Sequence, residues 1–387
     1  MLLPERGGGD WLTRRPYHVL GAPGERGVAF QHPSAARAAL PPDIAFLRAE
    51  GVEDRVLIRA AAAAAEAGTD AATALLNAGL VEETAYYRAL ARTLGASYLD
   101  GPIPFGPGLH FPETLVAGRA PLAPGSAAAW VLAPRGRTIT ALLDSALWTR
   151  PPAITSPTHL REAVFTAIPE QVADHAAHDF ARRMPERATA CEPTVWWLLV
   201  LGLALTAGFS LYAALPAPLA RAVMLAAQCL FLAMTTVRLA AVAIDAPVTA
   251  PAAATVPPLA ETALPVYTIL VPLYREAAVV PGLLRALAAL DYPPAKLDIK
   301  LLIEADDRET RAALAPVLLP ARFEVITVPP GGPRTKPRAL NAGLPLARGD
   351  LLTVYDAEDF PDPGQLRLAA ALFARLPART ACLQGRS

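Results

Sequence analysis

The sequence has no excess of charge of either sign, because 35 basic and 35 acidic residues balance over 387 positions. This balance gives no electrostatic basis for binding nucleic acid. Cysteine is also rare, and Cys191, Cys229 and Cys382 are scattered without a metal-binding spacing. Residues 1–16 lack the apolar core of a signal peptide. These absences argue against a disulfide framework and against a nucleic-acid partner.

Charged residues make up only 18% of the chain and hydrophobic residues 53%, which indicates a membrane segment. Residues 195–215 contain no charge and no proline. At about 1.5 Å per residue, a helix of this length crosses a hydrocarbon core of about 30 Å. Trp196 and Trp197 lie at one end of the segment and Tyr212 lies near the other, as in an aromatic belt. We therefore predict a first transmembrane helix here.

A second apolar segment, residues 222–244, follows a turn at Pro216-Ala217-Pro218. It is interrupted by Gln228 and Arg238. An arginine within a span is costly unless it reaches an interface, and Arg238 is near enough to the end to snorkel. The two segments predict a transmembrane hairpin over 195–244. The alternative is a pair of helices buried in a soluble core, which their length and scarcity of charge disfavour.

Basic residues flank the hairpin unevenly. Arg182, Arg183 and Arg187 precede the first span, whereas the tip carries only Arg221. The positive-inside rule therefore places residues 1–190 in the cytoplasm and returns the chain there after two crossings. We predict a multi-pass protein of the bacterial inner (cytoplasmic) membrane, in contact with the lipid bilayer and with both soluble domains on the cytoplasmic side.

The soluble parts differ in composition. Residues 1–35 are rich in Gly, Arg and Pro and predict a flexible arm. Residues 36–170 predict a small α/β domain, in which a helix ends at Asn77-Ala78-Gly79 and a strand leads to a helix capped near Ser156. Residues 246–265 form a semi-rigid Pro/Ala linker.

One phrase of the 36–170 domain is informative: Leu75-Leu76-x-x-Gly79-Leu80-Val81, followed by Ala89-Leu90-Ala91-x-x-Leu94-Gly95. It resembles the N-terminal domain of type II secretion and pilus ATPases. The resemblance implies a domain that docks a partner. Some members of that family bind cyclic di-GMP through an Arg-Leu-Gly start to the first helix. Here that place reads Thr69-Asp70-Ala71-Ala72-Thr73-Ala74, without the arginine and the glycine, so cyclic di-GMP binding is doubtful.

Strand and helix patterns alternate over residues 266–387, which predicts a mostly parallel, doubly wound sheet. Polar side chains follow several of these strands, where open α/β sheets place their ligands. They are Pro272-Leu273-Tyr274-Arg275-Glu276 after the first strand, Glu304-Ala305-Asp306-Asp307 after the second, the basic loop 330–338 before a helix, and Asp356-Ala357-Glu358. Asp362 and Gln365 predict a last helix with Pro363 in its first turn.

Two of these groups have a direct chemical interpretation. Asp356 and Glu358 are two residues apart at the end of a strand, so on extended backbone they point the same way. Paired carboxylates there suit a hard divalent cation, Mg²⁺ or Mn²⁺, that also binds phosphate oxygens. Lys336, with Arg334 and Arg338, suits a diphosphate, since lysine is an effective point charge for phosphate. The alternatives are solvated turns, helix caps or a solvated basic loop.

The four groups in this order, after a membrane hairpin, resemble family 2 glycosyltransferases with the glycosyltransferase A fold, in particular the membrane-anchored group that includes cellulose synthases. The resemblance implies a metal-dependent, inverting transfer from a nucleotide sugar, such as a UDP-sugar, to a polysaccharide or another acceptor. It implies that Pro272, Tyr274 and Glu276 cradle the uridine, and that Lys336 and Asp356 face the diphosphate. Glu304, Asp306 or Asp307 would hold the base or the ribose, and Asp306 is the preferred candidate. Asp356 and Glu358 would coordinate the metal.

The family resemblance also implies features that this sequence does not contain. Family members place an acceptor base in a Thr-Glu-Asp-like motif beyond the metal strand, and processive members add Gln-x-x-Arg-Trp. Neither motif is present before Ser387, and no candidate base follows Asp362. We expect a C-terminally truncated transferase domain with a nearly whole donor site. The alternative function is a non-catalytic membrane protein that docks a partner or regulates it. A soluble nucleotide-sugar pyrophosphorylase is a weaker third hypothesis.

Overall fold

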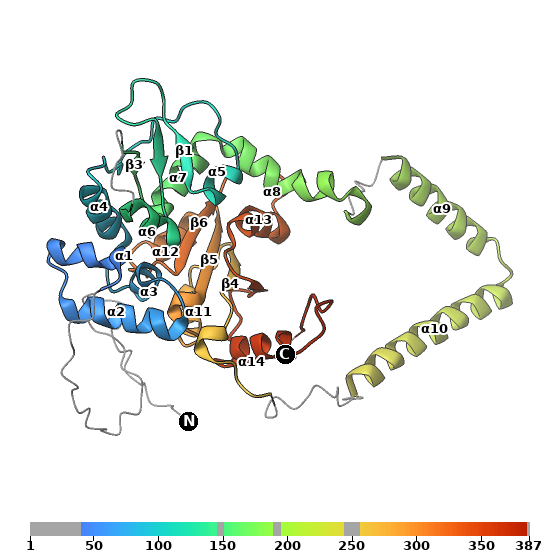
Figure 1. Cartoon of the computed structure of the whole chain (residues 1–387). Helices are drawn as coiled ribbons and strands as arrows, with labels where there is room; N and C mark the ends of the chain where they lie inside the picture. The colour runs from blue at the N-terminus through green and yellow to red at the C-terminus, as the bar shows by residue number, and fades with distance from the viewer. Residues whose placement is uncertain (1–39, 145–150, 189–194, 244–255, 385–387) are drawn as a thin grey trace, which may run out of the picture. The chain divides into compact units, whose positions relative to one another are not determined.

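The computed structural model of the chain describes residues 40–144, 151–188, 195–243 and 256–384. The predicted arm at 1–35 and residues 246–255 of the predicted linker lie outside these ranges. The chain divides into two compact units, Phe180–Val256 and a larger unit that joins Met1–Asp179 to Pro257–Ser387. Figure 1 labels the elements of both units.

Four parallel strands form the main sheet of the larger unit, in the order β6-β5-β4-β7. The predicted mixed α/β architecture with a parallel sheet is thereby confirmed for the C-terminal domain, residues 257–384. Because the strands all run the same way, their carboxyl ends meet at one edge. The strands are β4 (Tyr267–Leu273), β5 (Leu297–Glu304), β6 (Phe323–Val328) and β7 (Leu351–Val354), and the helices of this domain are α11 (Val280–Ala288), α12 (Arg308–Leu314), α13 (Lys336–Gly343) and α14 (Gln365–Phe373).

The last helix begins later than its sequence predicts. Pro363 was expected in its first turn, but α14 begins at Gln365. The Asp362 carboxylate accepts a hydrogen bond from the Gly364 backbone N–H at 2.8 Å. This bond closes a turn at the residues that would otherwise open the helix.

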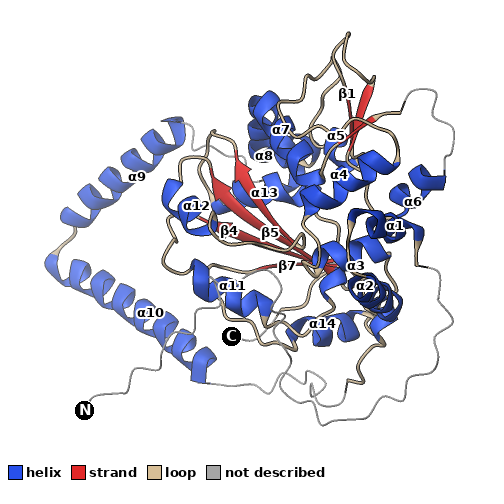
Figure 2. Ribbon diagram, turned by 90° about the vertical axis from the view of Figure 1, so that its left-hand side faces the viewer, coloured by secondary structure: helices blue, strands red, loops and turns tan. Residues whose placement is uncertain are grey.

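Different parts of the chain cover the two faces of this sheet. One face packs against α11 and α14, and the opposite face packs against α13, as Figure 2 shows. The second face is also covered by the N-terminal region, residues 40–179, through α7 (Pro157–Ala167) and α8 (Pro169–Arg183). This shared core contains Leu270, Leu302 and Ile326 from the strands, Ala339 and Ala342 from α13, and Phe165, Val172 and Ala176 from α7 and α8.

The N-terminal region is mostly helical, and short polar caps set its helix starts. The Asp70 carboxylate caps α3 by accepting from the Thr73 N–H at 2.8 Å, and the Ser156 hydroxyl caps α7 by accepting from the His159 N–H at 3.1 Å. The predicted capped strand-to-helix junction at Ser156 is confirmed. The other elements are α1 (Pro42–Ala45), α2 (Asp54–Ala67), α3 (Ala71–Asn77), α4 (Glu83–Thr93), α5 (Glu113–Val116), α6 (Arg137–Asp144), and a small sheet of β1 (Arg119–Pro121), β2 (Trp130–Leu132) and β3 (Ala153–Ile154).

The C-terminus of α3 is hydrogen-bonded to the C-terminal domain. Asn77 Nδ2 donates to the carbonyl oxygens of Pro294 at 3.2 Å and Leu297 at 3.3 Å. In return, Arg322 Nη1 donates to the Asn77 carbonyl oxygen at 2.6 Å. This carbonyl is one of the last in α3, which have no partner within the helix. The two parts of the larger unit therefore satisfy each other's backbone groups.

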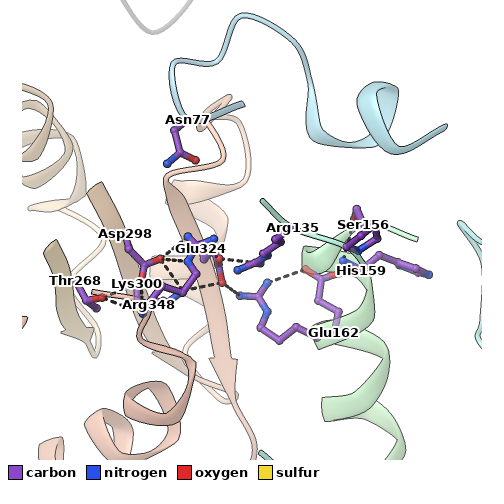
Figure 3. A network of polar contacts seen from close by, with 12 residues as sticks. Asn77, Arg135, Ser156, His159, Glu162, Thr268, Asp298, Lys300, Glu324 and Arg348 are labelled. Carbon is purple, nitrogen blue, oxygen red and sulfur yellow. Dashed lines mark hydrogen bonds and ion pairs between the residues drawn. The ribbon is translucent and has the colours of Figure 1, made fainter. Parts of the chain in front are cut away.

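A buried carboxylate, Glu324 of β6, joins the same two parts (Figure 3). Its oxygens lie 3.1 Å from Lys300 Nζ and 3.3 Å from Arg348 Nη2, both of the C-terminal domain. They also lie 3.1 Å from Arg135 Nη2 and 3.7 Å from Arg161 Nη1, both of the N-terminal region. One carboxylate thus holds cations from both sides of the interface.

A second buried carboxylate completes the cluster. Asp298 accepts from Lys300 Nζ at 2.8 Å, from the Thr268 hydroxyl at 2.9 Å and from Arg348 Nε at 2.9 Å. Lys300 is fully buried, so each of its charge partners offsets a large desolvation cost. Burial of charge at this interface is tolerated because opposite charges and hydrogen bonds compensate it.

The smaller unit contains α9 (Val195–Ala213) and α10 (Ala217–Ala243). Two stretches in them, Trp196–Ala213 and Ala217–Ala240, are long and apolar enough to cross a membrane, and neither is buried inside the protein. Exposed apolar side chains surround both helices, including Leu203, Phe209 and Phe231. The soluble-core alternative requires such side chains to be covered, and within the described residues they are not.

The Glu324 cluster generates a stability prediction. Glu324→Gln leaves the surrounding buried cations without their shared anion, so we expect the free energy of unfolding to fall by about 3 kcal/mol. Thermal unfolding of the purified chain at pH 7 measures the change. The matched control is Glu66→Gln on the exposed side of α2, which should be neutral. Equal melting temperatures for Glu324→Gln and the wild type would contradict the assigned role.

The same variant has a distinct pH dependence. Burial alone would raise the pKa of Glu324, but Lys300 and the arginines hold that pKa well below its usual value of 4.5. A carboxylate with a lowered folded-state pKa contributes stability above its unfolded pKa, and this contribution is lost as the pH falls through the folded pKa. The wild-type melting temperature should therefore fall more steeply below pH 4.5 than that of Glu324→Gln.

Candidate functional site

The loop after β4 has a strained conformation that two hydrogen bonds hold in place. Arg275 has a φ of 59°, in the left-handed region, which costs a non-glycine residue about 1–2 kcal/mol. Its backbone N–H donates to the Asp307 carboxylate at 2.6 Å. The next N–H, of Glu276, donates to the Thr310 hydroxyl at 3.0 Å. The start of α12 therefore fixes the loop that follows β4.

Asp307 has a structural role, because its carboxylate accepts the hydrogen bond from Arg275. It is buried, and its second oxygen caps α12 by accepting from the Thr310 N–H at 3.0 Å. Burial opposes ionisation, but the hydrogen bonds from Thr310 and Arg275 lower the pKa of Asp307 below its ordinary value. Asp306 beside it is exposed and pairs with Arg334 Nη1 at 2.7 Å. Of the two neighbouring aspartates, Asp306 is the one that faces solvent at the sheet edge.

Glu304, the last residue of β5, also faces protein rather than solvent. Arg338 of α13 donates to both of its oxygens, at 3.1 and 3.0 Å, and to the Pro329 carbonyl oxygen. Arg338 is only 2% exposed, so it does not extend into solvent with Arg334. This buried pair joins the end of β5 to the first turn of α13.

Lys336 and Asp356 are brought together although they are 20 residues apart in sequence. Lys336 is the first residue of α13, and its Nζ forms an ion pair with Asp356, which follows β7. Both side chains are about half exposed, at 45% and 53%. The Asp356 N–H donates to the Asp359 carboxylate at 2.7 Å, so Asp359 caps the turn. The pair places a cation and a carboxylate at the carboxyl edge of the sheet.

Carboxylates from two strand ends face one another here. Burial raises the pKa of Glu276, and the nearby charges of Asp356 and Glu358 raise it further, against a hydrogen bond from the Tyr274 N–H. The described residues contain no cluster of three or more His, Cys, Asp or Glu arranged to hold a metal ion. The exposed carboxylates of Asp356 and Glu358 are two hard oxygen ligands, and Lys336 pairs with the first of them in this structure. By their chemistry these two carboxylates fit part of the coordination of Mg²⁺ or Mn²⁺.

The remaining predicted residues lie in or next to β4. Pro272 is inside β4, opposite Leu302 of β5. Tyr274 is exposed at the strand end, with the Arg275 guanidinium over its ring at 5.1 Å from the centroid. The sheet edge thus brings together Tyr274, Glu276, Asp306, Lys336, Asp356 and Glu358, while Glu304 and Asp307 are turned inward to hold elements in place.

Sequence reasoning missed Thr310 and the positive φ of Arg275. Thr310 stands three residues after Asp307, the spacing of a helix cap, and that pattern could have identified both residues as the start of α12. No sequence signal marks Arg275, because a left-handed residue is expected to be glycine, asparagine or aspartate.

The C-terminal domain is a parallel α/β domain with acidic and basic side chains at the carboxyl ends of its strands, where open α/β sheets place their ligands. Residues 265–387 match the family described as glycosyltransferase like family 2. This match confirms the predicted family 2 resemblance of the C-terminal domain.

One similar solved structure is the mannosyltransferase PcManGT from Pyrobaculum calidifontis in complex with GDP-Man and Mn²⁺. The two are 27% identical over 29% of this chain, with a TM-score of 0.25. The alignment spans 33% of the mannosyltransferase, about a third of its length. No curated protein matches the chain.

Proposed function

We propose that the chain binds a nucleoside diphosphate sugar at the carboxyl edge of the β6-β5-β4-β7 sheet, as the donor half of a family 2 glycosyltransferase of the glycosyltransferase A type. One observation carries the proposal: the Lys336–Asp356 ion pair, inside the part of the chain that matches the family. A phosphate-binding cation and a metal-binding carboxylate that touch each other define one position for a metal diphosphate.

Each residue at the edge receives a role from its exposure and its partners. Tyr274 and Asp306, both exposed, contact the base and the ribose. Lys336 binds the diphosphate, and Asp356 with Glu358 holds Mg²⁺ or Mn²⁺. When bound, the metal neutralises charge on the leaving nucleoside diphosphate. Pro272 and Glu276 shape the β4 side of the site, and Glu304 and Asp307 act indirectly, by fixing α13 and the β4 loop.

The finer parts of the proposal come from the family resemblance. They are uridine as the base, inversion at the sugar carbon, and a polysaccharide or another hydroxyl as the acceptor. The alternative function, a membrane protein that docks or regulates a partner, predicts little or no sugar transfer. Titration with the nucleotide separates these two functions, because metal-dependent binding supports the donor site and no binding supports the alternative.

We also propose that α9 and α10 form a transmembrane hairpin of the cytoplasmic membrane, with both soluble parts on its cytoplasmic side. The proposal is supported by the length of the two helices and by their exposed apolar side chains. In lipid a helix satisfies its own backbone groups, so two helices with apolar surfaces can cross without further partners.

The donor site is tested with Asp356→Asn. With Mn²⁺ present, we expect UDP to bind the variant at least about tenfold more weakly, because a charge-assisted metal contact is lost. Without metal, the variant should bind UDP as well as the wild type or better, since Lys336 is released and one repelling carboxylate is gone. Calorimetric titration with UDP, and with GDP in parallel, measures both conditions.

The control is Asp100→Asn, which removes the carboxylate of an exposed ion pair with Arg88. This pair is far in sequence from Asp356. The control variant should bind nucleotide as the wild type does in both conditions. An affinity unaffected by Mn²⁺, or lost equally with and without it in Asp356→Asn, would contradict the metal role.

The membrane proposal is tested by alkaline carbonate extraction of membranes from expressing cells. An integral hairpin should stay in the membrane pellet, and Leu203→Arg with Leu232→Arg should release the chain, because each arginine costs about 2.5–3.5 kcal/mol within a span. Release of the unaltered chain into the supernatant would show that α9 and α10 do not cross the bilayer.

A further inference from the structure

α13 is the helix that supplies Lys336, and it is held tightly between two layers. Where α13 approaches β5, a Cβ at Gly343 would lie 2.6 Å from Leu302 Cδ2, so a larger residue there would force the Leu302 side chain to shift. Ala339 and Ala342 share one core with Leu302 of β5 and with Val172 and Ala176 of α8. The helix therefore has little freedom to shift along the sheet without disturbing one of its two neighbours.

A side-chain hydrogen bond joins α13 to α8. Asn341 Nδ2 donates to the Ala176 carbonyl oxygen at 3.0 Å, in a partly buried position. Asn341 is one and a half turns from Lys336 on the same helix. Because an α-helix is rigid over this distance, a shift of Asn341 relative to α8 would also move the backbone of Lys336, whose side chain pairs with Asp356.

The loop before α13 passes the same helix. A Cβ at Gly331 would lie 3.1 Å from Ala173 Cβ and 2.8 Å from Arg338 Nη2. The loop is therefore confined between α8 and the buried Arg338 side chain. This loop also carries Arg334, the partner of Asp306.

We propose that Asn341 is a positioning residue for the diphosphate, and that α8 of the N-terminal region is the support against which it sets α13. The proposal rests on the proposed function of the C-terminal domain. By this proposal the N-terminal region has a role within the chain. It packs against the face of the main sheet that α13 also covers. A small displacement of a cation that binds phosphate lowers the affinity for the diphosphate strongly. The contact of α13 with α8 therefore affects nucleotide binding.

The sequence provides a matched control, because it has only two asparagines. The side chains of both donate a hydrogen bond between the N-terminal region and the C-terminal domain. Asn77 is bonded to backbone carbonyls before and within β5, away from α13. Asn→Asp at either position replaces an amide donor by a carboxylate that repels the carbonyl oxygen. The two variants therefore make the same chemical change at two positions, one in α13 and one at the end of α3.

The test compares Asn341→Asp with Asn77→Asp in the full chain, by amide hydrogen exchange and by nucleotide titration with Mn²⁺. In Asn341→Asp, the amides of α13 should exchange about tenfold faster, since a net hydrogen bond is lost and a repulsion is gained. UDP should bind about tenfold more weakly while UMP, which lacks the second phosphate, changes little. Asn77→Asp should lower the melting temperature but leave α13 exchange and the preference for UDP over UMP unchanged.

A second variant, Gly331→Ala, guards against a fold defect at Asn341, because it disturbs the contact with α8 from the loop before α13 and leaves Asn341 unchanged. It should reduce the preference for UDP over UMP in the same direction. Unchanged α13 exchange in Asn341→Asp, or equal effects of the two Asn→Asp variants, would overturn the inference. A wild type that binds no nucleotide would instead refute the proposed function, and the exchange data would still decide whether α8 supports α13.

Discussion

The structure of the larger unit depends on one buried carboxylate, Glu324. It lies on the sheet face that the N-terminal region covers, and it holds Lys300 and Arg348 from one part of the chain and Arg135 and Arg161 from the other. Glu324, Lys300 and Arg161 are buried, and none of these three charges could be buried there alone, because desolvation would cost each several kcal/mol. The packing of the N-terminal region against the sheet and the burial of this cluster therefore require each other.

That packing places the carboxyl edge of the main sheet between elements that are themselves held in place. α12 fixes the strained loop after β4 through Asp307 and Thr310, and α13 is fixed by Glu304 on one side and by α8 on the other. The exposed side chains left at the edge are few and of both signs. The N-terminal region, for which the sequence predicts a partner-docking domain, packs against the main sheet of its own chain.

Local patterns predicted much of this arrangement. Alternating apolar runs and helix caps gave the parallel sheet, and acids and bases placed directly after strands gave Asp356 and Lys336, which the structure joins in an ion pair. Local patterns could not predict that Asp307 is buried and Asp306 exposed. That difference depends on the hydrogen bond that Asp307 accepts from the Arg275 N–H, in the loop after β4. The burial of Asp298 and Lys300 could not be predicted from local patterns either. Charges in a central strand can be buried only with partners, and these partners, Glu324 and the arginines around it, come from distant parts of the chain.

A nucleoside diphosphate sugar is proposed to bind at the carboxyl edge of the main sheet. Photo-crosslinking with 5-azido-UDP-glucose and Mn²⁺, followed by mapping of the modified peptides by mass spectrometry, tests this placement. It predicts saturable labelling of the loops that contain Tyr274 and Asp306, and suppression of this labelling by excess UDP. Labelling confined to the N-terminal region, or labelling that excess UDP does not suppress, would contradict it.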